Sequence, residues 1–145
     1  MNNIDQIQKE IIEEFQFLQD WESKYEYIIE LGKSLPPMDE QHKIDENLIK
    51  GCQSRVWLWG ELLPDGKVSY IADSDAIITK GIIALLLRVF NHQTPDDIIN
   101  ADIYFVDKIG LKEHLSPTRA NGLVAMIKHI KFFALGLKLK NSEKT

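Results

Sequence analysis

The sequence has 145 residues and a single cysteine, and this scarcity excludes several kinds of site. One thiol cannot form an internal disulfide, and alone it cannot supply a cysteine-rich zinc or iron–sulfur site. Such cysteine usage fits a reducing compartment. The first five residues also lack the charged-then-apolar pattern of a secretory signal peptide. We therefore expect a cytoplasmic protein with no metal site.

A basic surplus and a long apolar run are lacking as well. The formal net charge is -5, whereas nucleic-acid-binding proteins usually carry an excess of Lys and Arg. The longest apolar run covers about residues 82–87, and a membrane-spanning helix needs roughly 20 such residues. Hydrophobic residues make up 44% of the chain, which is enough for one buried core. We expect a single domain over residues 1–145, with neither nucleic acid nor membrane as a partner.

Apolar residues recur at three- and four-residue steps in several stretches, and this spacing predicts helices. Residues 4–18 and 21–35 form two of them, separated near Asp20, and the prolines at positions 36 and 37 end the second. Residues 77–89 are apolar on nearly all sides, so we expect the central core helix there. Residues 117–137 form the last helix.

A hairpin is predicted in the middle of the chain. Residues 55–63 and 68–72 have the composition of strands, and the intervening Pro-Asp-Gly-Lys sequence is typical of a turn. Because both faces of the first strand are apolar, we expect helices over one face and a loop or a partner over the other. Residues 103–106 fit either a short third strand or a loop with a helical turn.

Cys52 lies in residues 48–57, LIKGCQSRVW, immediately before the first predicted strand. Gly51 permits backbone angles that other residues avoid, and therefore allows a sharp turn. Lys50 and Arg55 add positive charge, which favours the thiolate form of a nearby cysteine. A lone cysteine is often a small buried hydrophobic residue, but Cys52 lies outside any apolar period. A structural role and a reactive role both fit these residues.

Other polar residues have two interpretations each. Arg119 falls in the first turn of the last helix, where the helix dipole disfavours a cation, so it is either solvated or kept there to meet an acidic group or a persulfide of a partner. Asp73 and Asp75 fit helix N-caps, with a binding role as the alternative. The four histidines match neither a protease signature nor metal-ligand spacing, and we expect surface positions for His42, His92, His114 and His129.

Four stretches resemble one known family, in the order that the family has them. Residues 51–57, GCQSRVW, closely resemble the cysteine-loop motif of the SufE proteins, which accept sulfur from cysteine desulfurases. The other three are residues 21–32, WESKYEYIIELG, residues 73–81, DSDAIITKG, and residues 115–123, LSPTRANGL. The likeness extends from about residue 5 to residue 138.

The resemblance implies an α/β (α+β) fold like that of iron–sulfur scaffold proteins, with a small three-stranded antiparallel sheet packed by helices and a long C-terminal helix. It implies that Cys52 carries a persulfide and that the partner surface includes Arg119, Asp75, Gly51 and Gln53. Cluster scaffolds of this fold use several cysteines. One cysteine therefore predicts sulfur transfer and no cofactor bound by this chain.

The implied partners are a SufS-type cysteine desulfurase or a paralogue, which would carry pyridoxal phosphate, and a downstream iron–sulfur scaffold. The chain would stimulate the desulfurase as an accessory protein. We expect its loop to hold Cys52 against apolar surface at rest and to swing out on docking. Two alternatives stay open: a cysteine-dependent hydrolase or acyltransferase, which needs a base beside Cys52, and a non-catalytic module that stimulates a desulfurase by contact alone.

Overall fold

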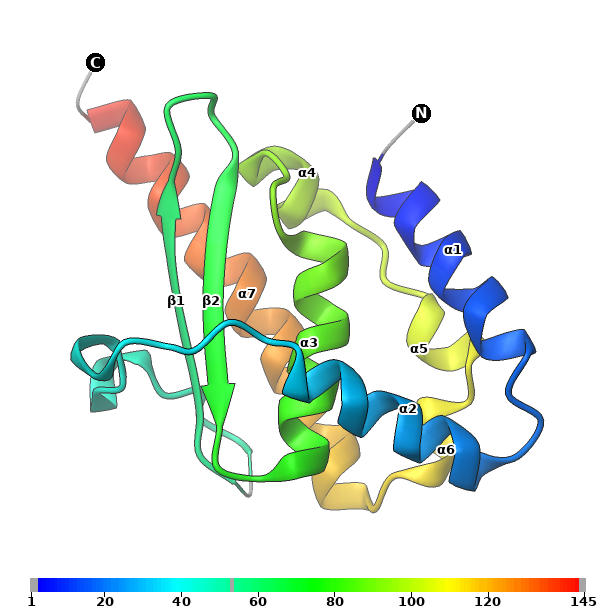
Figure 1. The fold of residues 1–145 in the computed structure, drawn as a ribbon. Coiled ribbons are helices and arrows are strands. Elements are labelled where there is room, and N and C mark those ends of the chain that lie inside the picture. The colour runs from blue at the N-terminus through cyan, green and yellow to red at the C-terminus, as the bar shows by residue number, and fades with distance from the viewer. Residues whose placement is uncertain (1–2, 53, 144–145) are drawn as a thin grey trace.

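The computed structural model describes residues 3–52 and 54–143, which form a mixed α+β fold with a long C-terminal helix. The elements are α1 (Asn3–Gln16), α2 (Trp21–Lys33), β1 (Val56–Leu62), β2 (Val68–Ser74), α3 (Ile77–Phe90), α4 (Pro95–Asn100), α5 (Phe105–Lys108), α6 (Leu111–His114) and α7 (Pro117–Glu143). Figure 1 shows the β1–β2 hairpin at one side of the molecule, α7 crossing behind it, and α1 and α2 on the far side of α3. No helix in the described ranges is both long enough and apolar enough to cross a membrane.

The predicted helix starts follow from side-chain capping. The Asp20 carboxylate accepts a hydrogen bond of 2.7 Å from the Ser23 amide at the start of α2. The Thr94 hydroxyl accepts one of 3.2 Å from the Asp97 amide at the start of α4, where Pro95 occupies the first position. Each cap satisfies an amide that has no partner inside its helix. The separation of α1 from α2 near Asp20 is confirmed.

Helix α3 is the centre of the core, as its composition predicts. Ten of its residues are buried: Ile78, Thr79, Gly81, Ile82, Ile83, Leu85, Leu86, Leu87, Val89 and Phe90. One prediction for this helix is wrong, because Ile77 at its first position is 66% exposed. The N-cap residue is Ala76, and no side chain caps the helix.

The capping role predicted for Asp73 and Asp75 is therefore also wrong. Asp73 is drawn instead into ion pairs with Lys43 at 2.8 Å and Lys80 at 3.2 Å. Partial burial would raise the pKa of Asp73, but its hydrogen bonds to Lys43, Ser74 and Lys80 hold that pKa below the ordinary value. Asp75 accepts a hydrogen bond from the backbone outside the helix, as described below.

The sheet has two strands within the described residues, and the three-stranded prediction is wrong there. β1 and β2 pair antiparallel, from Val56 opposite Ser74 to Leu62 opposite Val68. Residues 103–106 do not form a strand, because the side chain of Gln8 takes up the local backbone groups: it accepts from the amides of Tyr104 and Phe105 and donates to the Asp102 carbonyl. Helix α5 then begins at Phe105.

Helices α2 and α3 pack through their glycines. A Cβ atom on Gly81 would lie 2.2 Å from the Ile28 carbonyl oxygen, and one on Gly32 would lie 2.7 Å from the Gly81 amide nitrogen. Real Cβ atoms do not approach other heavy atoms this closely, so the two backbones meet at a distance that only glycine permits.

We predict that Gly81→Ala lowers the free energy of unfolding by about 1–3 kcal/mol or more, because the methyl group forces the two helices apart. Urea denaturation measures this change. Gly136→Ala is the matched control, since no atom lies within 4 Å of the added methyl group in α7, and it should stabilise the protein by about 0.5–1 kcal/mol. Equal effects of the two substitutions would contradict the close packing.

Candidate functional site

The loop that carries Cys52 has a fixed base. On one side, the Ile49 amide donates a hydrogen bond of 2.8 Å to the Val56 carbonyl. On the other, the Arg55 amide donates to the Asp75 carboxylate at 3.1 Å, while the Arg55 carbonyl accepts from the Asp75 amide at 3.2 Å and from the Ser74 hydroxyl at 2.8 Å. The loop that carries Cys52 is therefore anchored on both sides, at Ile49 and at Arg55.

The segment before this loop lies over the outer face of β1 and contains two short 3₁₀ turns, Glu40–His42 and Asp45–Asn47. His42 stacks on Trp59 with ring centroids 4.1 Å apart, and the Lys43 ammonium lies 5.7 Å from the centre of the Trp57 ring. A loop thus shields the second apolar face of the hairpin, as the sequence predicts.

Cys52 rests against helix α7. Gly51 has φ of 95°, so the predicted sharp turn is present. The Cys52 thiol is half-buried and donates a weak hydrogen bond of 3.7 Å to the Gly122 carbonyl. A Cβ atom on Gly122 would stand 3.6 Å from the thiol sulfur, an ordinary van der Waals distance, so the loop packs directly on the helix at this point.

The structure brings Cys52 and Arg119 to the same small cavity. Its volume is about 10 Å³, which is at most the room that one water molecule needs. It is also lined by Ser54, Thr79, Ile82, Thr118, Gly122 and Met126. The hydroxyls of Ser54 and Thr79 lie 3.5 Å apart. This is a second weak contact that holds the loop, after the one between Cys52 and Gly122.

The electrostatics at rest differ from the sequence-based expectation. Burial raises the pKa of the Cys52 thiol above its ordinary value. Lys50 and Arg55 are exposed, so water screens their charges. The expectation that they favour the thiolate is therefore wrong for this conformation. Arg119 is exposed, and its guanidinium makes no ion pair with any residue that the structure describes.

Asp75 and Gly51, two of the other predicted partner-binding residues, lie beside Cys52 but do not line this cavity. Asp75 is exposed and anchors the loop through Arg55. Gly51 is exposed next to Ala125 of α7, which would be 3.3 Å from an added Cβ atom. Gln53 lies outside the described residues. The partner-binding roles of Arg119, Asp75, Gly51 and Gln53 stay predictions.

Three residues of this region were missed by sequence reasoning. Gly122 interrupts a helix at a cost of about 1 kcal/mol relative to alanine, and that anomaly signals a close contact. Thr79 is the one polar side chain among the buried residues of α3, where it is 6% exposed. The exposure of Ile77 carries no sequence signal, because its position fits the apolar period of the helix.

The histidines do not form a base for Cys52. Among them, His129 is half-buried and its burial lowers its pKa, but it lines a separate groove with Lys50 and Phe132. It follows Gly122 by seven residues, or about 10 Å along the axis of α7. His42 and His92 lie elsewhere, and His114 stacks on Trp21. Among the described residues, no three His, Cys, Asp or Glu side chains are grouped so that they could hold a metal ion.

We predict that iodoacetamide alkylates Cys52 slowly at neutral pH and that the rate rises with pH through a midpoint above that of the unfolded chain. The thiolate is the reacting form, and burial raises the pKa of this thiol. The same chain in urea is the control, because it exposes the only thiol. If the pH midpoint of alkylation in the native protein is at or below the midpoint in urea, burial does not disfavour the Cys52 thiolate.

Comparisons with known proteins place these features in a family. The sequence matches the SufE family, described as an Fe-S metabolism associated domain, over residues 9–134. It is 42% identical over 140 residues to an uncharacterized SufE-like protein of Rhizobium meliloti (strain 1021), covering 94% of this chain and 97% of that one. The fold is similar to the solution structure of a hypothetical protein from Thermus thermophilus, with a TM-score of 0.75 and 20% identity over 92% of this chain and 96% of the other. The chain therefore belongs to the SufE family of proteins associated with Fe–S metabolism.

Proposed function

We propose that this protein accepts sulfur from a cysteine desulfurase onto Cys52 as a persulfide, stimulates that enzyme and passes the sulfur on for iron–sulfur cluster assembly. The observation that carries the proposal is the setting of the only thiol, on a short loop with a fixed base and a lightly held tip. Membership of the SufE family supports the same role.

The reaction is a thiol exchange. The Cys52 thiolate attacks the outer sulfur of the desulfurase persulfide, a new S–S bond forms to Cys52, and the donor S–S bond breaks. The desulfurase thiolate leaves, and the proton of the outer sulfur stays with it on Cys52. No external oxidant is needed, because the sulfur moves at an unchanged oxidation level.

This exchange requires the tip of the loop to leave its resting place. The cavity beside Cys52 has a volume of about 10 Å³, so it offers little room around the thiol. The resting site also disfavours the thiolate that must attack. We therefore expect docking to draw the thiol away from the α7 surface, as in the predicted swing of the loop.

The contacts of the loop fit such a movement. Its tip is held by the 3.7 Å thiol–carbonyl contact to Gly122 and the 3.5 Å hydroxyl contact between Ser54 and Thr79, both at the long limit for hydrogen bonds. Its base is held by backbone hydrogen bonds at Ile49 and Arg55. The tip can therefore move about two fixed ends while the hairpin stays intact.

The surface around the loop offers contacts for a partner. Arg119 supplies an unpaired cation at the mouth of the Cys52 cavity, suited to an acidic group or a persulfide anion. Ile77, two residues before the cavity-lining Thr79, exposes 66% of its surface and would be an apolar contact. We place Asp75 and Gly51 at the same interface.

The hydrolase alternative has weaker support. The hydrogen-bond partner of the Cys52 thiol is a carbonyl oxygen. A carbonyl oxygen accepts a hydrogen bond from the thiol but does not act as a base that deprotonates it. A cysteine hydrolase instead needs an imidazole in that position. The other alternative is a non-catalytic module that stimulates a desulfurase by contact alone. Such a module would not acquire sulfur on Cys52, and this difference can be measured.

We predict that Cys52→Ser abolishes both persulfide formation and stimulation of the desulfurase. After incubation with desulfurase, pyridoxal phosphate and cysteine, intact-protein mass spectrometry should find one added sulfur atom on the wild-type chain and none on the variant. Circular dichroism controls for the fold, which a half-buried thiol-to-hydroxyl change should leave intact. Full stimulation by Cys52→Ser would show that contact alone is sufficient and would overturn the transfer role.

We predict that Arg119→Ala weakens docking to the desulfurase by about tenfold, as expected for loss of one charged interface contact of about 1.4 kcal/mol. Titration of desulfurase activity with the variant measures the half-saturating concentration. Lys140→Ala is the matched control, since it removes an exposed cation near the other end of the same helix. If affinity and maximal rate are unchanged in Arg119→Ala, its side chain is only solvated.

A further inference from the structure

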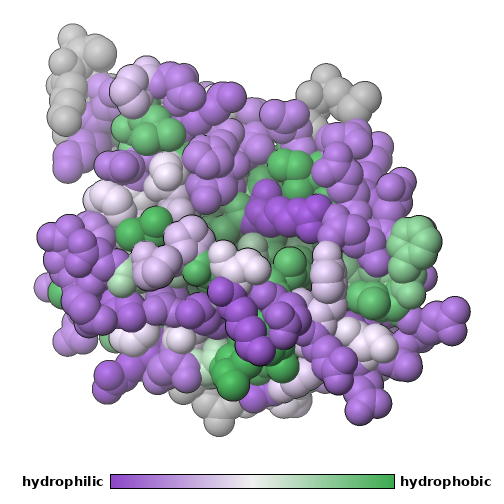
Figure 2. All heavy atoms as spheres, viewed as in Figure 1, coloured by the Kyte–Doolittle hydropathy of each residue, from purple (hydrophilic) through white to green (hydrophobic). Residues whose placement is uncertain are grey.

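A second and much larger cavity lies away from the Cys52 loop. It has a volume of about 620 Å³, within the range of about 300–1,000 Å³ that is usual for ligand sites. It is bounded by α1, the end of α2, the edge of β2 and the second half of α3. Figure 2 shows apolar atoms at the bottom of a hollow in the middle of this face of the molecule. Lys67, in the lining of this cavity, directly precedes β2, and the far end of that strand at Ser74, which contacts Arg55 beside the Cys52 loop, is about 20 Å away along the strand.

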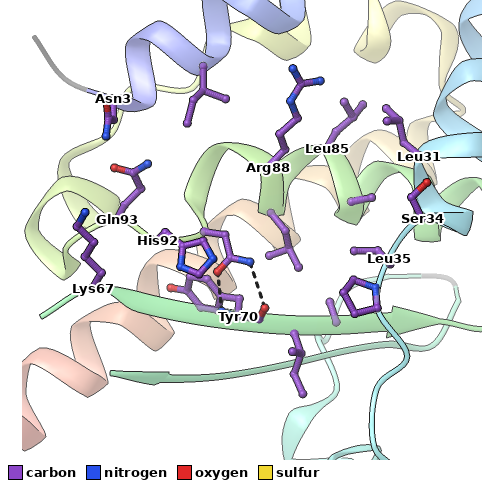
Figure 3. A pocket seen from close by; sticks show the side chains of 17 residues that line it. Asn3, Leu31, Ser34, Leu35, Lys67, Tyr70, Leu85, Arg88, His92 and Gln93 are labelled. Carbon is purple, nitrogen blue, oxygen red and sulfur yellow. Dashed lines mark hydrogen bonds between the residues drawn. The ribbon is translucent and has the colours of Figure 1, made fainter. Parts of the chain in front are cut away.

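The lining of this cavity is divided by polarity. Figure 3 shows Lys67, His92, Gln93 and Asn3 gathered toward one end, and Leu31, Leu35 and Leu85 toward the other. We refer to them as the polar end and the apolar end. A cavity built in this way suits a molecule that is itself polar at one end and apolar along its body.

Gln93 supplies a side-chain amide at the polar end of the cavity. The residue is only 5% exposed, and its side-chain amide has no hydrogen-bond partner within the part of the chain that the structure describes. No fully enclosed side-chain polar atom lacks a partner among these residues, so the Gln93 amide must face open space, and the space it lines is this cavity. Its hydrogen-bond partner is therefore either water or a molecule bound in the cavity, and this makes Gln93 a candidate ligand-binding residue.

The backbone around Gln93 is strained into position. His92 has φ of 60°, an uncommon value for a residue other than glycine. Its amide donates to the Val68 carbonyl at 2.9 Å, and the Gln93 carbonyl accepts from the Val68 amide at 2.8 Å. The two residues are thereby fixed against the edge of β2, with their side chains on the lining of the cavity.

The charges of the cavity favour an anion. Its lining contains Lys67, Arg88 and His92 and no acidic residue, although the chain as a whole has a net charge of -5. Arg88 is already matched, because its guanidinium binds the Glu14 carboxylate through two hydrogen bonds. Lys67 has no ion pair within the described residues, so its ammonium is available at the polar end.

We propose that this cavity is a binding site for a small amphipathic carboxylate, a free monocarboxylic acid with an apolar chain. Its carboxylate would accept hydrogen bonds from the Gln93 amide and the Lys67 ammonium. Its apolar chain would lie against Leu31, Leu35 and Leu85. The site is separate from Cys52 and does not depend on sulfur transfer.

Decanoate, below the concentration at which it forms micelles, is the probe, and ¹H–¹⁵N correlation spectra of the full chain are the readout. We expect saturable shifts centred on residues 67–72 and 91–93, with a dissociation constant on the order of 1 mM or lower. Acetate lacks the apolar chain and decanol lacks the charge, so each should bind at least about tenfold more weakly. Cys52→Ser should bind decanoate like the wild type.

Two variants test the polar end. Lys67→Ala should weaken decanoate binding about tenfold, and Gln93→Leu should weaken it while keeping the volume of the side chain. Lys108→Ala is the matched control, since Lys108 is exposed and lies outside the cavity. Because Lys67 is exposed, its variant should fold even if Gln93→Leu does not. The proposal is overturned if no saturable shift occurs, if the shifts centre elsewhere, if decanol binds as well as decanoate, or if Lys67→Ala binds like Lys108→Ala.

Discussion

The position of Cys52 depends on the clamp at the base of its loop. Backbone hydrogen bonds at Ile49 and Arg55 fix the two ends of the short loop that carries Cys52. Such a short closed loop has few conformations available, so ordering its tip costs little entropy. Two weak contacts to α7 and α3 are then enough to hold the thiol at rest. The hairpin, α3 and α7 therefore each contribute contacts that position Cys52.

The same arrangement makes the reactivity of the Cys52 thiol depend on the position of its loop. Desolvation disfavours the thiolate, and a carbonyl acceptor stabilises the neutral thiol, so the resting protein is a poor nucleophile. A partner that draws the tip into water or toward a cation reverses both effects at once. Arg119, which lines the same cavity, is a cation of this chain that could take part. The protein would thus be reactive mainly when docked.

Local signals in the sequence account for most of the fold. The cap at Asp20, the Thr94-Pro95 start and the turn at Gly66 are each set by residues close to one another in the chain, and so they could be predicted. The absence of a third strand could not be predicted, because it depends on Gln8 bonding to backbone nearly one hundred residues away. For the same reason, the sequence did not predict that Asp73 would pair with Lys43 rather than cap α3.

The candidate site also has features that the sequence predicts and features that it does not. The sharp turn at Gly51 follows from its own residue type, whereas the contact of Cys52 with Gly122 joins segments that are 70 residues apart. Burial raises the pKa of Cys52, and the lysine and arginine residues nearby in the sequence do not reveal this burial. Charge proximity along the chain is a poor guide when the side chains point into water.

A two-stranded sheet is sufficient here because other groups occupy its edges. An isolated hairpin is at best marginally stable, and exposed edges invite pairing with other chains. On the outer edge of β2, the Asn91 side chain accepts from the Tyr70 amide at 2.8 Å and donates to its carbonyl at 3.3 Å, next to the backbone bonds of Val68 with His92 and Gln93. The Asn91 amide therefore replaces the strand that would otherwise lie there. The large cavity lies next to this part of β2, and α1, the end of α2 and α3 form its other walls.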